Sequence, residues 1–413
     1  MSSFQTALSG LRAASTNLQV LGNNIANANT VGFKQSNAQF ADVYAQAIAG
    51  AAPQYGQVGI GTNVQTIAQQ FSQGNIQTSN NPLDVAINGA GFFKFDYNGS
   101  EVCGRNGQFQ IDKEGYIVDG GGAKLIGTPA VSGALTGGSG PLQITATSLA
   151  PKTTTSATVE LNLNANAPLI SSGTAFSITD PKSYNYSTTT TVYDSLGTPH
   201  LMSTYFRLQT SGGTGQTWDV YYSVDGTTSS GGITSGGPLT IQFSSTGTIS
   251  GTASGSVGPL SWADGASGST IALDFAGSTN YYAPSAVNNI VNNGYGPGQL
   301  SNLAIDPSGI IFGRYTNGQS AILGQVTLTN FRAPQGLQRL GNNYFAATYQ
   351  SGPPLTGVPE AAGLGSLQAG AIEQSNVELE TQLVNLIVAQ QAYQANAQTI
   401  KTQQQVVQTL LNL

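Results

Sequence analysis

Residues 379–411 have the sequence LETQLVNLIVAQQAYQANAQTIKTQQQVVQTLL. Within this stretch, apolar and small or amide side chains recur at alternating spacings of four and three residues. This spacing predicts a long helix that packs along a second helix, as in a coiled coil. The members of the stripe are Leu379, Leu383, Leu386, Gln390, Tyr393, Ala397, Ile400, Gln404, Val407 and Leu411.

The opposite face of this helix is neutral. It carries the amides Gln391, Gln394, Gln398 and Gln403, and Lys401 is the single charged residue after Glu380. A helix face that stays in water normally carries charged side chains. Neutral amides therefore favour a face that ends against neighbouring subunits.

The N-terminal stretch predicts a second helix. Gly10 and Gly22 weaken it, each by about 1 kcal/mol relative to Ala, and the asparagine-rich run 23–29 weakens it further. Its apolar stripe is Phe4, Leu8, Leu11, Leu18 and Ile25 with Ser15, and a second row, seven residues apart, is Ala7, Ala14, Leu21 and Ala28.

Between the two helices the sequence predicts β-structure. Short apolar runs are bounded by the turn dipeptides Asn98-Gly99, Asn106-Gly107 and Asn317-Gly318. The predicted strand regions are 84–87, 92–95, 303–312 and 322–331.

The middle of the chain, 146–284, differs in composition because Thr, Ser and Gly dominate it. Its predicted strands alternate between apolar and polar residues, which indicates an inserted all-β domain of sandwich or barrel type. The inward positions are Val159, Leu161 and Leu163, then Trp218, Val220, Tyr222 and Val224, then Ile271, Leu273 and Phe275.

The predicted fold class is mainly β with terminal α-helices, in discontinuous nested domains that bring the two ends of the chain together. The helices form a coiled-coil-like pair, and two β-rich domains of sandwich or barrel type follow. The predicted division is 1–33 with 370–413 as the helical core, 34–75 with 354–369 as a connecting segment, 76–145 with 285–353 as an inner β domain, and 146–284 as an outer β domain.

The composition excludes several classes of function. Charged residues make up 8% of the 413 residues, against about 25% in typical soluble proteins. The net charge is −6 and no basic run occurs, which argues against nucleic-acid binding. We expect no membrane insertion, since no apolar run is long enough to span a bilayer, and no cleaved signal peptide at the N-terminus.

Residues for chemistry are scarce. The chain has one histidine, His200, in an apparent turn, and one cysteine, Cys103. One of each cannot form an ordinary zinc site, and Cys103 is expected to be a buried apolar residue. We predict no catalytic residues, cofactor or metal, although 19 acidic residues leave a glycosidase as a distant alternative.

Both ends of the chain resemble a known family. Residues 23–34, NNIANANTVGFK, resemble the N-terminal signature of the bacterial flagellar rod and hook proteins, and 375–379 with 393–400 resemble its C-terminal signature. Residues 83–87, 91–93 and 105–109 are similar to its shared β domain, as are 317–318 and 323–325, and 191–197 to the outer domain of hook subunits. The signature residues are Asn23, Asn24, Asn27, Gly32, Phe33, Lys34, Asn376, Tyr393 and Asn396.

The resemblance implies a structural subunit of the flagellar hook, a curved, hollow, flexible tube that acts as a universal joint and transmits torque from rod to filament. It implies export by the flagellar type III apparatus to an extracellular position. The implied partners are copies of the chain itself, the rod, the hook cap and the hook–filament junction proteins. The expected polymer core contacts are Phe4, Leu8, Leu11, Leu18, Leu21, Ile25, Leu379, Leu383, Leu386, Tyr393, Ile400, Val407 and Leu411.

Helices this rich in Gly, Asn and neutral amides are weak alone, so we expect them to be largely disordered in the monomer and to fold on assembly. The simpler alternative is a stable helical hairpin within one domain. Two other functions stay open: a rigid subunit of the distal-rod type, and a secreted β-rich adhesin or binding module.

Overall fold

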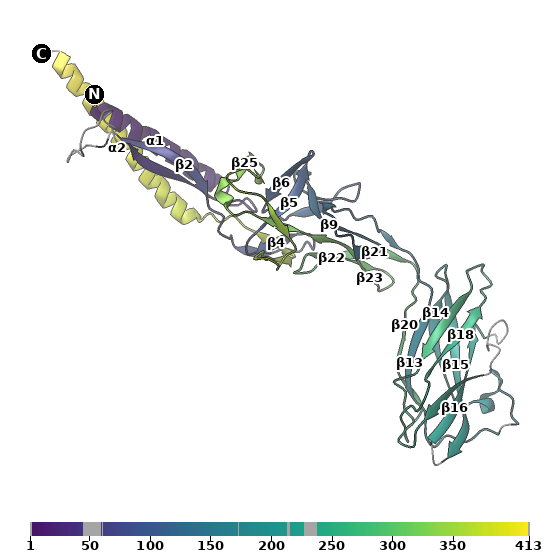
Figure 1. Ribbon diagram of the computed structural model, residues 1–413. Coiled ribbons are helices and arrows are strands. Elements are labelled where there is room, and N and C mark those ends of the chain that lie inside the picture. The colour runs from purple at the N-terminus through teal and green to yellow at the C-terminus, as the bar shows by residue number, and fades with distance from the viewer. Residues whose placement is uncertain are drawn as a thin grey trace, which may run out of the picture. The chain divides into compact units, whose positions relative to one another are not determined.

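A computed structural model describes residues 2–43, 59, 61–171, 173–212, 215–226 and 238–411. The chain forms two compact units: unit 1 comprises Met1–Ala146, Asn302–Arg314 and Ser320–Leu413, and unit 2 comprises Thr147–Ser301 and Tyr315–Gln319. Most described elements are β-strands, with one α-helix at each end of the chain (Figure 1). The predicted fold class is therefore confirmed.

Helix α1 (Ser2–Ala26) and helix α2 (Leu379–Leu411) lie side by side in unit 1 (Figure 1). The buried side of α1 consists largely of small residues. The row that includes Ala7, Ala14 and Leu21 faces inward, whereas the row of larger side chains that includes Phe4 and Leu8 does not. The buried apolar residues of α1 are Ala7, Ala13, Ala14, Val20 and Leu21.

Gly10 accounts for one close approach of the two helices. A Cβ added at Gly10 would lie 2.7 Å from Oδ1 of Asn396 on α2. The glycine that weakens α1 in sequence terms is thus the position that admits the Asn396 side chain. Gly22, by contrast, has no atom within 4 Å of such a Cβ.

A β-hairpin packs against α1. Strands β1 (Ser36–Val43) and β2 (Gly61–Gln69) are antiparallel, with an irregularity between Gln39 and Phe40. The C-terminal segment before α2 also pairs with strands near the start of the chain: β28 (Ser366–Ala369) with β4 (Val85–Asn88), and β29 (Ala371–Glu373) with β3 (Ile76–Thr78). The two chain ends are therefore joined by strand pairing as well as by the helices.

The β-rich part of unit 1 is one large sheet in which β9 and β5 are central. Aromatic residues fill its core, and Cys103 is buried beside Phe92 and Phe345, as expected. The predicted strand region 303–312 is interrupted by a turn, in which Gly309 N–H donates to the Asp306 carbonyl.

Unit 2 contains two four-stranded sheets, β18-β19-β13-β20 and β14-β15-β16-β17, whose buried side chains form one core. This is the sandwich arrangement. The predicted inward residues of all three strands lie in or against this core. Strand β20 (Ala286–Asn292) pairs with β13 (Ser156–Asn162), so it lies in unit 2, whereas the sequence division placed it in the inner β domain.

The other strands of unit 1 are β5 (Phe92–Tyr97), β6 (Ser100–Gly104), β7 (Phe109–Ile111), β8 (Ile117–Asp119), β9 (Lys124–Val131), β10 (Ala134–Leu135), β11 (Gly140–Pro141), β22 (Ile310–Tyr315), β23 (Ser320–Val326), β24 (Leu328–Asn330), β25 (Gln338–Gly341), β26 (Tyr344–Ala346) and β27 (Leu355–Gly357). Those of unit 2 are β12 (Ser148–Leu149), β14 (Tyr186–Tyr193), β15 (Pro199–Gly212), β16 (Gly215–Val224), β17 (Leu239–Phe243), β18 (Ser254–Leu260) and β19 (Ser269–Asp274). Strand β21 (Gly298–Ile305) crosses the division, because its residues up to Ser301 belong to unit 2 and those from Asn302 to unit 1. Two 3₁₀ turns are Pro181–Ser183 and Pro334–Gly336. Neither α-helix is apolar enough over a sufficient length to cross a membrane, as judged on the described residues.

Candidate assembly surface

A buried ion triad lies where the two ends of the chain meet the β-sheet. The Glu373 carboxylate accepts hydrogen bonds from Lys34 Nζ at 2.6 Å, Arg105 at 3.0 Å and the Gly74 N–H at 2.8 Å. The side chains of Lys34 and Glu373 are fully buried, and that of Arg105 is almost so. One residue thus comes from each end of the chain and one from the sheet.

Burial sets the electrostatics of this triad. Burial lowers the pKa of Lys34, and the adjacent Glu373 carboxylate opposes that effect. Arg105 also stacks over the Phe92 ring at 5.4 Å from its centroid. A buried charge is tolerated only with its partner in place, because its loss leaves an uncompensated charge in a medium of low polarity. We call this set (Lys34, Glu373, Arg105) the junction triad.

Two of the signature asparagines bind the backbone of other segments. Asn24 is fully buried: its amide donates to the Ser36 carbonyl at 2.8 Å and its oxygen accepts from the Ser36 N–H at 3.0 Å. The Asn376 side chain accepts from the Gln35 N–H at 2.8 Å and donates to the Gln70 carbonyl at 2.9 Å. Both side chains therefore bind the backbone at Gln35 and Ser36, in the segment that follows α1.

The other signature residues have separate local roles. Phe33 is buried, and the Gly32 N–H donates to the Glu373 carbonyl at 2.8 Å. The amide of Asn27 donates to the carbonyl of Asn23 one turn earlier at 2.9 Å. On α2, Asn396 lies beside Gly10, and Tyr393 is exposed.

Replacing Gly32 with alanine is expected to lower the free energy of unfolding of unit 1 by about 2–3 kcal/mol. Gly32 has φ = +70°, and an added Cβ would lie 2.6 Å from the backbone N of Asn106, which cannot rotate away. The matched control is Gly22→Ala, which should raise stability by about 1 kcal/mol because that site is open. Denaturant unfolding followed by the helical circular-dichroism signal measures both. Equal effects of the two substitutions would contradict the steric account.

The first three turns of α2 expose a cluster of aliphatic side chains. Leu383 is 48% exposed, Val384 60%, Ile387 55% and Val388 58%. Leu379, at the start of the helix, is also exposed. We call these five residues the apolar patch. Isolated exposed aliphatic residues are ordinary, but a contiguous set on one element marks an interaction surface.

The side of α2 that faces α1 overlaps the predicted stripe only in part. It is centred on the buried residues Gln382 and Ala389, with Leu386 and Ile400 partly buried beside them. Of the residues expected in the polymer core, Leu21 is buried, whereas Phe4, Leu379, Leu383, Tyr393 and Val407 are exposed. Leu8, Leu11, Leu18 and Ile25 are partly buried, and the Leu411 side chain lies outside the described residues.

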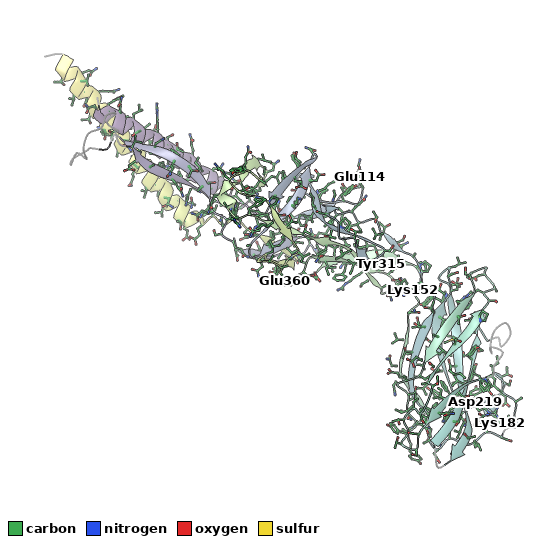
Figure 2. All side chains as sticks on the ribbon, viewed as in Figure 1. Glu114, Lys152, Lys182, Asp219, Tyr315 and Glu360 are labelled. Atoms are coloured by element: carbon green, nitrogen blue, oxygen red, sulfur yellow. The ribbon has the colours of Figure 1, made fainter. Side chains whose placement is uncertain are left out.

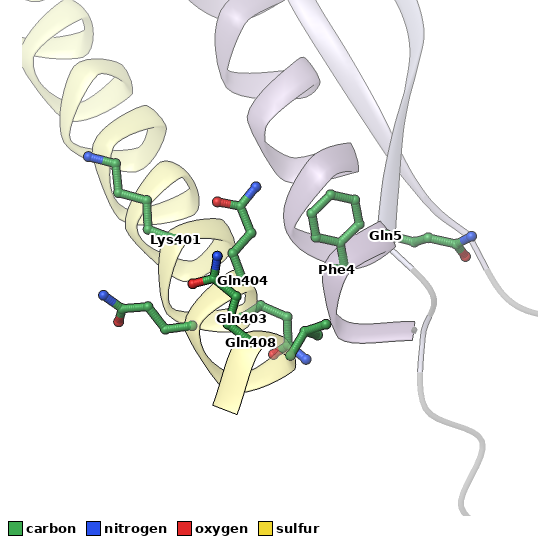
Figure 3. A pocket seen from close by; sticks show the side chains of 8 residues that line it. Phe4, Gln5, Lys401, Gln403, Gln404 and Gln408 are labelled. Carbon is green, nitrogen blue, oxygen red and sulfur yellow. The ribbon is translucent and has the colours of Figure 1, made fainter. Parts of the chain in front are cut away.

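A groove of about 880 Å³ lies at the other end of the helix pair, between the first turn of α1 and the last turns of α2. Figure 3 shows Phe4 on one wall and Lys401, Gln404 and Gln408 on the other. Its lining is Phe4, Gln5, Lys401, Gln403, Gln404, Gln405, Val407 and Gln408. Its walls are therefore apolar and amide side chains with a single charge.

Unit 2 holds the group of residues that most resembles a chemical site. Sequence placed His200 in a turn, but it is the second residue of β15, and the turn precedes it. Its Nδ1 lies 2.6 Å from Asp225 and its Nε2 3.4 Å from Asp194, and its ring stacks on Trp262 at 4.2 Å. Burial would lower the pKa of His200, but these two carboxylates outweigh burial and raise it.

The same contacts act on Asp194. Burial would raise its pKa, but hydrogen bonds involving Asp264, the Thr198 N–H and His200 outweigh burial and lower the pKa to about 2. In the described residues, Asp194, His200 and Asp264 could offer metal-ligand atoms within 4.8 Å of one another. His200 pairs with Asp194, and Asp264 accepts a hydrogen bond from Thr198 Oγ1 at 2.9 Å, so contacts within the protein hold the three side chains. Other polar residues of unit 2, such as the buried Asp219 and the exposed Lys182 labelled in Figure 2, lie outside it.

Unit 2 is expected to lose stability as the pH rises through the pKa of His200 in the folded state. Since folding raises this pKa, the stabilisation is complete below its ordinary value of 6.5 and disappears above the folded value. The two tryptophans, Trp218 and Trp262, both lie in unit 2, so thermal unfolding followed by their fluorescence reports this unit. H200Q should flatten the dependence, and an unchanged slope in that variant would contradict the assignment.

Sequence reasoning missed the partners of Lys34 and the full extent of the apolar patch. Nothing in the sequence around Glu373 indicates that it meets a lysine 339 residues earlier. The patch could have been found, because Val384, Ile387 and Val388 fall outside the predicted stripe and are apolar without an assigned partner.

Family models match four parts of the chain. Residues 4–34 match the model described as flagella basal body rod protein, and 368–413 match flagellar basal body rod FlgEFG protein C-terminal. Residues 86–163 match the flagellar hook protein FlgE/F/G D1 domain, and 160–295 match the flagellar basal body protein FlaE D2 domain. The last two matches cover most of unit 2 and the strands of unit 1 from 86 to 141.

Similar proteins match over their whole length. Flagellar hook protein FlgE of Salmonella typhimurium is 41% identical over 421 residues, covering 100% of both chains. That of Escherichia coli is 41% identical over 99% of both chains, and that of Borreliella burgdorferi 30% identical over 100% of this chain and 99% of its own. The crystal structure of Helicobacter pylori flagellar hook protein FlgE2 has a TM-score of 0.53 and 16% identity, and covers 72% of this chain and 100% of its own, which shows a shared fold. The resemblance at the two chain ends is thus confirmed, and the chain belongs to the flagellar hook protein family.

Proposed function

We propose that this chain polymerises with copies of itself into the flagellar hook and that its role is structural rather than catalytic. The observation that carries the proposal is the apolar patch on α2, which one copy of the chain leaves in water. Covering each half-exposed aliphatic side chain is favourable by roughly 25 cal/mol per Å² of apolar surface. A second copy supplies the same low-charge helices and can cover it.

The expected core contacts enter this proposal in two groups. Leu21, Leu386 and Ile400 hold α1 and α2 together within one copy. Leu379, Leu383 and Val407 are exposed in one copy and are assigned to contacts between copies. The helices, 1–33 with 370–413, then form the inner tube and transmit torque.

The β-rich parts are assigned to the outside of the tube. Their surfaces are rich in Ser, Thr, Gly and Asn, whose contacts with neighbouring copies can exchange with water at little net cost. An interdigitated apolar interface would not allow such exchange. Sliding of these surfaces would let the tube bend while the inner helices keep it stiff in torsion. Replacing Ser and Thr on the outer surfaces with bulky apolar residues should straighten or stiffen the tube, and unchanged bending would defeat this part of the proposal.

The proposal includes the remaining expectations from the sequence. Assembly follows export by the flagellar type III apparatus without removal of a signal peptide. Rod, hook cap and hook–filament junction proteins are the further partners. No cofactor, metal or nucleic acid takes part.

The decisive experiment is negative-stain electron microscopy of the purified full chain and of a chain that ends at Glu378. This end point removes α2 but keeps Glu373 and Asn376, so the junction triad stays intact. Curved hollow tubes from the full chain and none from the shorter one are expected. Straight tubes would favour a distal-rod-type subunit, and monomers with protease-resistant ends would favour an adhesin-like module.

A further inference from the structure

Among the described residues, two surfaces of the helix pair have no partner, and they lie at its opposite ends. The apolar patch occupies 379–388, and the groove lies at 401–408 with the first turn of α1. At 1.5 Å of rise per residue, the two are about 30 Å apart along α2. One chain cannot bring them together, whereas two chains can.

Resting on the proposed self-assembly, we propose that the apolar patch of one copy docks into the groove of the next copy. This pairs two different surfaces, so each added copy presents a free patch at one end and a free groove at the other. Contacts of this heterologous kind do not close on themselves in a dimer and generate open helical polymers. The pairing would therefore be the contact that propagates the tube.

The chemistry of the two surfaces is matched. The patch offers aliphatic side chains, and the groove offers Phe4 and Val407 between glutamine side chains. Neutral amides can be covered by a neighbour at lower cost than charges, since they exchange hydrogen bonds with water or with the partner. The groove is thus suited to an apolar helix face.

Charge favours this pairing over contacts between two patches or between two grooves. Helix α2 contains two charged residues, Glu380 within the patch region and Lys401 on the wall of the groove. Neither takes part in an ion pair within the described residues. Patch against patch would bring two copies of Glu380 together, and groove against groove two copies of Lys401. Patch against groove brings opposite charges together, which selects the correct partner surface.

Disulfide cross-linking between two single-cysteine chains tests the pairing. The native cysteine is buried and is removed by C103S in both chains. One chain then carries I387C in the patch and the other V407C in the groove, and the two are mixed, assembled under reducing conditions and oxidised. A disulfide forms only where the two Cα atoms come within about 7 Å. We expect 387–407 heterodimers from the mixture and none from either chain alone.

A matched control uses Y349C in place of I387C. Tyr349 is fully exposed but lies on the β-rich part, so it should give no cross-link to V407C. Tubes that form without a 387–407 disulfide, or 387–387 dimers from the I387C chain alone, would overturn the pairing while the hook function stands. If I387C prevents tubes, L383C replaces it. Failure of the native chain to form tubes would instead refute the proposed function, and the pairing with it.

Charge reversal gives an independent measurement. E380K and K401E should each raise the concentration needed for assembly by about fivefold, as expected for one partly exposed ion pair. The double variant should return to within about twofold of the native chain, because the pair is restored in reverse. If the double variant instead needed a higher concentration for assembly than either single variant, the pairing would be contradicted.

Discussion

Replacing Glu373 with glutamine is expected to lower the free energy of unfolding of unit 1 by about 3–5 kcal/mol. Glutamine keeps the size of the side chain but removes its charge, so Lys34 and Arg105 are left buried beside a neutral partner. Both cations lie at the base of the helix pair, and the helical circular-dichroism signal during denaturant unfolding measures the loss.

The matched control for this substitution is Glu378→Gln. Glu378 lies five residues later on the same segment, is exposed, and forms no ion pair with a described residue. It should change stability by less than about 0.5 kcal/mol. Replacing the triad together, with K34M, E373L and R105M, should recover most of the loss, since apolar residues of similar volume can substitute for a buried ion pair. A loss below about 1 kcal/mol for E373Q alone would show that the triad is not an obligatory contact.

The second large effect is expected for V384D combined with V388D. Both side chains lie on the apolar patch one helical turn apart and are more than half exposed in one copy. The variant should therefore keep its monomer stability. Assembly would have to bury two unpaired carboxylates at about 2–3 kcal/mol each, which raises the required concentration by roughly 1,000-fold or more.

Sedimentation and electron microscopy of the assembled material measure this effect. The control is Q338D combined with Q350D, two exposed residues of the β-rich part of unit 1, which adds the same charge. Tubes from the V384D/V388D chain at native concentrations would show that the patch is not covered on assembly. Loss of tubes in both variants alike would point to net charge rather than to the patch.

The sequence predicted both helices because a spacing of three and four residues persists through each. The sequence could not predict which apolar stripe of each helix faces the other helix, because each helix carries two such stripes. The row of Ala7, Ala14 and Leu21 is buried, although Phe4 and Leu8 make the more apolar row. Small side chains let the two axes approach closely, and that gain in contact depends on both helices at once.

The sandwich of unit 2 was predictable from alternation, since inward positions such as Leu161 and Trp218 repeat every second residue. The junction triad was not predictable. Its members are single residues in unrelated local contexts, separated by up to 339 positions, and no periodicity connects them. The signature asparagines are similar, because Asn24 binds the backbone of Ser36, 12 positions later, and Asn376 that of Gln70, 306 positions earlier, and no periodicity indicates either contact.

The junction triad also makes the order in which the chain emerges matter. A chain is synthesised from its N-terminus, so Lys34 and Arg105 appear hundreds of residues before Glu373, their shared counter-charge. Until the last tenth of the chain has emerged, Lys34 and Arg105 lack this counter-charge, and the carbonyls of Ser72 and Gly89 are their hydrogen-bond acceptors. A prematurely terminated chain would keep both cations in water and stay open at this point. A junction with balanced charge therefore requires residues from both ends of the chain.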